Sequence, residues 1–179
     1  FLTQFRVSGT NTKTRIVGNL PYYITTPIIT KLIESMARFE SLTVMMQKEV
    51  GDRIAAEPGT KLAGAITYAV HYRCTVDKIC DVSRESFYPV PKVDSVVLRL
   101  NMRDELAVQV NDENNFFRCI KAGFSMRRKT LLNSLQALDD VNKDVIKHAL
   151  ESANIDPSRR AETLTMEEFA ELSNSIWKE

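Results

Sequence analysis

The residues best suited to chemistry are Asn19, Leu20, Pro21 and Tyr22, which close the β-branched run at 15–19. That run predicts a buried strand ending in a turn, and open α/β sheets bind ligands at the carboxyl ends of their strands. The Asn19 side-chain oxygen can accept one hydrogen of an exocyclic base amine, and the backbone carbonyl at the Leu20–Pro21 step can accept the other. Proline holds the turn rigid, and the tyrosine ring can stack on the base.

Two such hydrogen bonds to the amine favour methyl transfer to its nitrogen. Accepting both hydrogens raises the electron density on the nitrogen as it becomes tetrahedral, so the reaction needs an aligned electrophile rather than a strong base. The four residues are therefore catalytic candidates. The same tetrapeptide also fits a plain turn into a helix, and by itself it does not decide between the two interpretations.

The elements that position this turn form an α/β pattern. Strands are expected at 15–19, 42–46, 75–82 and 92–100, and helices from Pro27 to Met36, at 47–56 and at 63–72. Two buried runs separated by a helix predict a β–α–β unit and a mostly parallel sheet. Beyond residue 101 the β signal fades, and helices are expected at 112–124, 127–138, 142–152 and 166–178. We therefore predict an α/β domain over residues 1–103 and a small all-α domain over residues 104–179.

Composition excludes several classes of protein. The chain has 179 residues, of which 44% are hydrophobic, so a wholly disordered chain is excluded. No apolar run approaches the roughly 18 residues that span a bilayer, and we expect no membrane association. The three cysteines form no CxxC pair, which suits a reducing, cytoplasmic compartment. His71 and His148 lie far apart, so we expect no metal site.

The segment from residue 114 to residue 138 has no acidic side chain. Its five cations are Arg118, Lys121, Arg127, Arg128 and Lys129. On adjoining helices, within a domain of negative net charge, they predict a face that binds nucleic-acid phosphates. The helix dipole does not explain the basic run at 127–129, because a helix start favours acidic residues. A merely solvated charged face is the alternative.

Five ordered stretches resemble the rRNA adenine dimethyltransferases, the kasugamycin-susceptibility family. They are Asn19–Ile29 (NLPYYITTPII), Gln47–Ala56 (QKEVGDRIAA), Phe87–Ser95 (FYPVPKVDS), Ala122–Asn133 (AGFSMRRKTLLN) and Arg160–Thr165 (RAETLT). The resemblance covers about residues 14–175. Two single-residue departures are mild: Gly18 and Gly51 stand where Ala is expected.

The resemblance implies a Rossmann-like methyltransferase that uses S-adenosyl-L-methionine. Its reaction would dimethylate the N6 amines of two adjacent adenines in a hairpin near the 3′ end of small-subunit (16S) rRNA, during ribosome biogenesis. Its partners would be small-subunit rRNA and the pre-30S particle, and it would act as a cytoplasmic monomer. The target base would be turned out of its stack into the pocket, which costs least in a loop.

The resemblance also assigns roles to residues. Asn19 would contact both the amine and the cofactor, Tyr22 and Phe87 would sandwich the base, and the basic run at 127–129 would hold RNA phosphates. Phe87 has a structural alternative, a core phenylalanine beside a proline-rich loop.

One departure is large. Family members begin with a strand, a glycine-rich turn that holds the cofactor and an acidic residue for the ribose, and none of the six glycines here has the spacing of such a turn. The chain resembles the C-terminal two-thirds of a family member, and we expect these 179 residues by themselves to bind the cofactor weakly and to be inactive. A non-catalytic rRNA-binding assembly factor is therefore an alternative. A DNA adenine methyltransferase is less favoured, because its related motif usually carries a second proline where this chain has Leu20.

Overall fold

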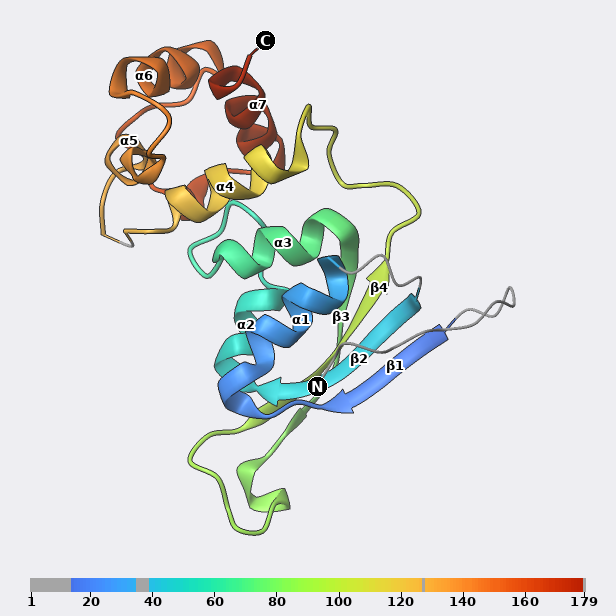
Figure 1. The fold of residues 1–179 in the computed structure, drawn as a ribbon. Helices are drawn as coiled ribbons and strands as arrows, with labels where there is room; N and C mark the ends of the chain where they lie inside the picture. The colour runs from blue at the N-terminus through green and yellow to red at the C-terminus, as the bar shows by residue number, and fades with distance from the viewer. Residues whose placement is uncertain (1–13, 35–38, 127, 179) are drawn as a thin grey trace.

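The structure, a computed structural model, describes residues 14–34, 39–126 and 128–178. Its lower half in Figure 1 is a four-stranded sheet with the strand order β1-β2-β4-β3. The strands are β1 (Thr14–Asn19), β2 (Phe39–Gln47), β3 (Cys74–Val82) and β4 (Ser95–Met102). β1 and β2 are parallel, as the β–α–β prediction requires, whereas β4 is antiparallel to both of its neighbours.

The prediction of a mostly parallel sheet is therefore wrong, because most pairings among the described strands are antiparallel. A parallel neighbour needs a crossover connection, usually a helix, whereas an antiparallel neighbour can follow directly. Between β3 and β4 the segment 83–94 holds only one short 3₁₀ turn, at Arg84–Ser86, and the chain returns at once alongside β3. β4 lies between β2 and β3, so two of the three pairings are antiparallel.

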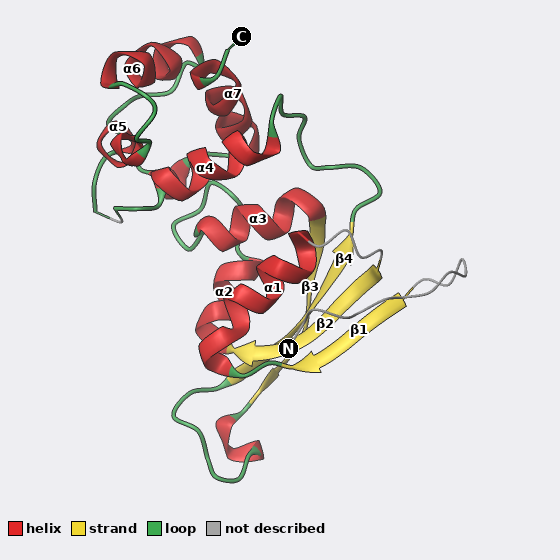
Figure 2. Cartoon of the chain, in the orientation of Figure 1, coloured by secondary structure: helices red, strands yellow, loops and turns green. Residues whose placement is uncertain are grey.

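Three helices, α1 (Thr25–Glu34), α2 (Lys48–Ala55) and α3 (Ala65–Arg73), lie on one face of the sheet (Figure 2). Their apolar residues recur at helical spacing, and Ile29 and Ile33 of α1 are buried one turn apart against the strands. α1 begins two residues before the predicted Pro27, after a 3₁₀ turn. Proline is tolerated there because the first turn of a helix has no partner for its N–H.

The remaining chain folds into helices around a second apolar cluster. They are α4 (Glu113–Gly123), α5 (Leu131–Ser134), α6 (Lys143–Ser152) and α7 (Met166–Ile176), with 3₁₀ turns at Leu135–Ala137 and Ala161–Thr163. Side-chain oxygens of Asp112, Asn142 and Thr165 cap α4, α6 and α7, which explains where these helices begin. The domain boundary at residues 103/104 stays a prediction.

The helix predicted at 127–138 is much shorter than expected. α5 spans only Leu131–Ser134. The N–H groups of Leu131 and Leu132 donate to the carbonyls of Arg159 and Pro157, at 2.7 and 3.4 Å, so a distant segment determines where the helix starts. Arg128 and Lys129 consequently lie in the turn before α5 rather than on a helix.

Candidate functional site

The four strands end or begin together at one edge of the sheet. Asn19 is the last residue of β1 and lies beside Met45 of β2. Gln47 ends β2 opposite Ser95, the first residue of β4, and Ser95 also pairs with Val82 at the end of β3. This is the carboxyl edge of the three strands that run in the same direction, where α/β sheets bind ligands.

The turn after β1 is held by its backbone. The Leu20 N–H donates to the Met45 carbonyl at 3.1 Å, and the Pro21 carbonyl accepts the Thr25 hydroxyl at 3.1 Å. Among the described residues, neither the exposed Asn19 side chain nor the Leu20 carbonyl oxygen has a hydrogen-bond partner. Two free acceptors therefore stand on a fixed backbone, as binding of an amine requires.

Tyr22 is anchored from across the sheet. Its hydroxyl and the Ser95 hydroxyl are 2.8 Å apart and share a hydrogen bond. Ser95 is fully buried, while Tyr22 is half-buried. Because the hydroxyl is engaged, contact of Tyr22 with a base would use the ring. Sequence reasoning placed Ser95 within a motif but missed this role, which joins residues 73 positions apart.

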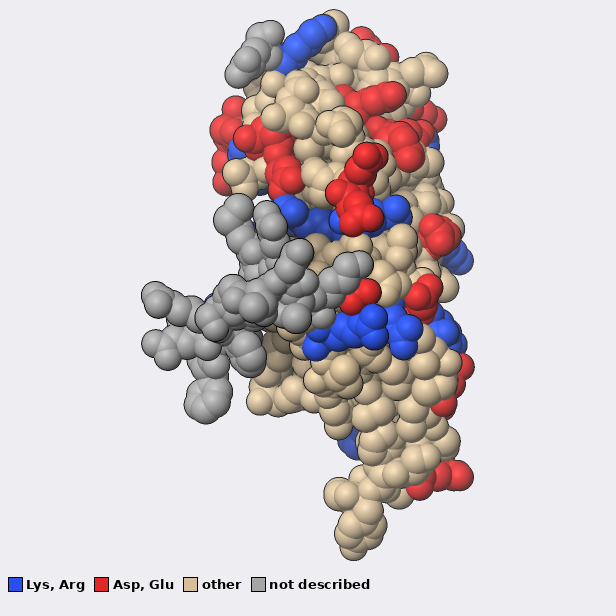
Figure 3. Space-filling view, turned by 90° about the vertical axis from the view of Figure 1, so that its right-hand side faces the viewer, with Lys and Arg blue, Asp and Glu red and all other residues tan. Residues whose placement is uncertain are grey.

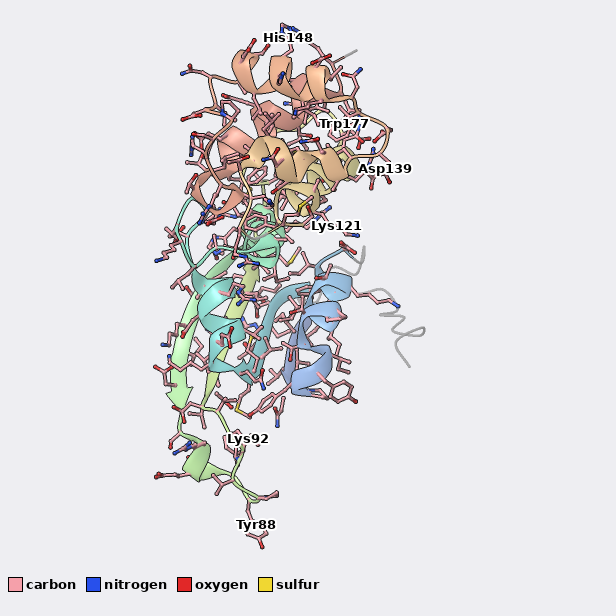
Figure 4. All side chains as sticks on the ribbon, turned by 90° about the vertical axis from the view of Figure 1, so that its left-hand side faces the viewer. Tyr88, Lys92, Lys121, Asp139, His148 and Trp177 are labelled. Atoms are coloured by element: carbon pink, nitrogen blue, oxygen red, sulfur yellow. The ribbon has the colours of Figure 1, made fainter. Side chains whose placement is uncertain are left out.

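Phe87 lies in the segment 83–94, which projects beyond the sheet edge, with Lys92 near the body and Tyr88 at the tip (Figure 4). Phe87 is half-buried. The ring contacts among the described residues involve α3 and the helical part, and none joins Phe87 to Tyr22. The aromatic sandwich of the target base stays a prediction.

An open hollow of about 410 Å³ adjoins the foot of this segment. It is lined by Lys48, Glu49, Asp52, Arg84, Lys92, Val93 and Asp94. The Lys48 ammonium lies 2.8 Å from the Asp81 carboxylate and 3.3 Å from that of Asp52. Its hydrogen bond to Asp81 lowers the pKa of that carboxyl and raises the pKa of Lys48. Lys48 and Asp81 are therefore both charged at neutral pH, and the lysine charge is already compensated.

Of the five predicted RNA-binding cations, Arg118 is engaged within the protein. Its guanidinium pairs with the Asp140 carboxylate and lies over the Trp177 ring, 5.1 Å from the ring centroid. The hydrogen bond from Arg118 lowers the pKa of Asp140. An RNA phosphate would have to compete with this carboxylate for the same guanidinium.

Lys121, Arg128 and Lys129 are exposed and have no ion pair with any described residue, and Arg127 lies outside the described residues. Figure 3 shows that one side of the helical part carries mainly acidic side chains. Figure 4 views the opposite side and places Lys121 at the lower border of the helical part. The free cations remain candidates for binding phosphate.

Neither a metal-binding cluster nor a membrane-spanning helix occurs in residues 14–34, 39–126 and 128–178. In those ranges, no three His, Cys, Asp or Glu side chains gather in a way that could hold a metal ion. His71 is buried, and its Nε2 lies 3.0 Å from the Ile54 carbonyl oxygen. None of the helices in the same ranges is both long and apolar enough to cross a membrane.

Comparison with known proteins yields a consistent set of relatives. The family model for ribosomal RNA adenine dimethylase matches residues 4–178. The ribosomal RNA small subunit methyltransferase A of Clostridium acetobutylicum is 49% identical over 172 residues, which is 96% of this chain and 62% of the relative. The protein of the same name in Geobacillus thermodenitrificans is 50% identical over 164 residues, 90% of this chain and 56% of the relative. The chain thus spans about six-tenths of these curated relatives.

Solved structures agree on the fold. A dimethyladenosine transferase from Plasmodium falciparum superposes with a TM-score of 0.71 at 28% identity, covering 93% of this chain and 68% of the other. The 23S rRNA methyltransferase ErmE gives a TM-score of 0.66 at 22% identity, covering 94% and 67%, a likeness of fold only. The fold is therefore a Rossmann-like α/β sheet followed by helices, as the sequence predicted.

Proposed function

Because the chain belongs to the ribosomal RNA adenine dimethylase family, we propose that the protein methylates the N6 amines of adenines in small-subunit rRNA. The observation that carries this proposal is the pair of unpartnered acceptors, the Asn19 side chain and the Leu20 carbonyl, at the carboxyl edge of the sheet. Two adjacent adenines in a hairpin near the 3′ end of 16S rRNA are the proposed targets, each methylated twice. The proposed setting is the pre-30S particle in the cytoplasm, with the protein acting as a monomer.

The proposed methyl donor is S-adenosyl-L-methionine, which supplies an electrophilic methyl group when bound. The exposed, unpaired Asn19 amide suits a contact at the point where donor and amine meet. Asn19 and the Leu20 carbonyl each accept one amine hydrogen and orient the nitrogen lone pair. Both acceptors are fixed before the base arrives, since the hydrogen bonds at Leu20 and Pro21 hold the turn.

The adenine ring is proposed to stack on Tyr22, with Phe87 on its other face. The bond to Ser95 holds Tyr22 in place, so a base that enters the site meets a ring already oriented. A base in a loop reaches such a site at lower cost than one in a duplex, because less stacking is lost. Arg118, Lys121, Arg127, Arg128 and Lys129 are proposed to hold the RNA backbone, with the cations free of ion pairs contributing most.

The test uses the purified full-length protein with an rRNA hairpin and the methyl donor. Asn19→Ala should lower kcat by about a hundredfold or more, the usual cost of removing one hydrogen bond made in the transition state. RNA affinity should change little, since phosphate contacts supply most of the binding. Asn114→Ala is the control, because Asn114 is exposed and no hydrogen bond of its side chain is found among the described residues.

Other outcomes decide between the alternatives. Activity of Asn19→Ala within a factor of about ten of wild type would contradict a catalytic Asn19. A wild-type protein that binds rRNA but transfers no methyl group would instead be an assembly factor. Methylation of adenine in DNA but not in RNA would instead identify a DNA adenine methyltransferase.

A further inference from the structure

The segment 83–94 exposes a cluster of apolar side chains. Tyr88 is 100% exposed, and Val90 and Val93 are 58% and 42% exposed. These three lie within six residues, while the other large exposed apolar side chains are scattered over the described chain. Apolar groups gathered at one point of a surface mark a contact site, whereas single ones need no explanation.

The same segment is fixed at its foot. The Asp94 carboxylate accepts the backbone N–H of Arg84 at 3.0 Å, and the Asp94 carbonyl accepts the backbone N–H of Lys48 at 3.0 Å. Pro89 and Pro91 restrict the backbone on either side of Val90. Tyr88 is therefore presented by a braced loop, and its ring loses little freedom when it binds a partner.

Two cations at the foot of the segment are free to contact the phosphates of a nucleic acid. Arg84 and Lys92 are exposed and form no ion pair with a described residue. Two acids lie on the same segment: the Asp94 carboxylate accepts the backbone N–H of Arg84, and Glu85 is exposed in the 3₁₀ turn. An exposed aromatic ring that stacks on a base, together with cations that contact the backbone, is the usual means of binding single-stranded nucleic acid.

The location points to the same partner. Ser95, which holds Tyr22, is only seven positions from Tyr88, so the tip lies at most about 25 Å from the site even if the chain is fully extended. A protein partner would need about 800 Å² on each side. One tyrosine, worth at most about 250 Å², and two valines fall well short of that area.

We propose that the segment 83–94 is an RNA-contacting arm in which Tyr88 stacks on an unpaired base that neighbours the target adenine. The inference rests on the proposed function, since it takes the adenine at Asn19–Tyr22 as its reference point. Arg84 and Lys92, at the foot of the arm, contact phosphates between that base and the target adenine. The arm thereby selects RNA in which the target lies in a single-stranded stretch.

The experiment measures binding of an rRNA hairpin to the full-length protein, with 2-aminopurine at each position beside the target adenine in turn. Tyr88→Ala should weaken binding about 5- to 150-fold, the effect of one base–aromatic stack. The 2-aminopurine quenching at one flanking position should disappear, and the salt dependence should stay unchanged because no phosphate contact is lost. Tyr88→Trp should retain both binding and quenching. Leu62→Ala, at another exposed apolar residue, is the matched control.

The outcomes separate this inference from the function on which it rests. If wild type neither binds nor methylates the hairpin, the proposed function fails. If wild type is active and the RNA affinity of Tyr88→Ala is within twofold of the wild-type affinity, the inference about the arm is overturned while the proposed function stands. Full rescue of binding by Tyr88→Leu would also overturn stacking, since an aliphatic side chain has no ring. Full exposure of Tyr88 means that these variants should keep the wild-type melting temperature.

Discussion

The hydrogen bond between Tyr22 and Ser95 leads to an asymmetric prediction for stability. Ser95 is fully buried, so Tyr22→Phe leaves a buried hydroxyl without a partner. We expect this change to lower the free energy of unfolding by about 1–3 kcal/mol. Ser95→Ala leaves the hydroxyl of the half-buried Tyr22, which can turn to water, and should cost only about 0.5–1.5 kcal/mol.

The double variant tests the coupling between the two groups. Once Ser95 is alanine, removal of the tyrosine hydroxyl strands no buried group, so the double variant should cost clearly less than the sum of the single changes. The assay is urea unfolding of all four proteins, supported by melting temperatures, which shift by about 2–4 °C per kcal/mol for chains of this size. Tyr23→Phe is the control, because Tyr23 is 85% exposed, and it should stay within about 0.5 kcal/mol of wild type.

The same variants test whether the bond serves catalysis. If it orients the ring for the base, Tyr22→Phe and Ser95→Ala should both lower kcat at saturating RNA, and the double variant should be no slower than the worse single one. Strict additivity of the unfolding free energies would refute the bond. Additive losses of kcat would refute the positioning role while leaving the bond in place.

Two further predictions concern charge. Changing Arg128 and Lys129 together to Gln should weaken RNA binding whatever the sequence and lower the log–log salt slope by roughly 0.7–0.9 for each lost phosphate contact; an unchanged slope in binding titrations would move the RNA surface elsewhere. Burial lowers the pKa of His71, so the unfolded chain binds its proton first, and stability should be complete above pH ~6.5 and fall as pH drops from there towards the folded-state pKa. Urea unfolding between pH 8 and 5 measures this fall in stability, which should be smaller in His71→Gln. A wild-type protein whose stability does not change over this pH range would contradict the reasoning.

Local patterns were enough to predict most elements of the fold. The β-branched run at Arg15–Asn19 and the apolar spacing of α1 and α7 are set by side chains close in sequence, and these elements appear where expected. The direction of β4 was not predictable in this way. The alternation of apolar and polar residues in that strand indicates that one of its faces is exposed to solvent, but it does not show which strands lie beside it. The short α5 is a similar case, since the Arg159 carbonyl determines its first residue.

In the candidate site, too, features set by residues close in sequence could be predicted, and features set by distant residues could not. The turn at Asn19–Tyr22 could be predicted because strand, turn and helix follow one another along the chain. The anchoring of Tyr22 could not, because it depends on the register that sets Ser95 opposite Gln47. The basic residues were found by composition, but only the structure distinguishes Arg118, bound to Asp140, from cations such as Lys121.

α3 connects the site to those cations. Val70 is buried in the cluster that lines the sheet, while Tyr68 and Tyr72, on the same helix, are buried in the cluster of the helical part. The Tyr68 hydroxyl donates to the Leu164 carbonyl. The Tyr68 ring packs edge-on against the Phe169 ring of α7, with 4.9 Å between the ring centroids. A helix buried on both sides ties two cores together far more firmly than an exposed linker does. If the proposed function holds, RNA bound by the helical part is presented to Asn19 at a fixed spacing, and each contact made by Lys121 or Lys129 then also helps to position the proposed target adenine.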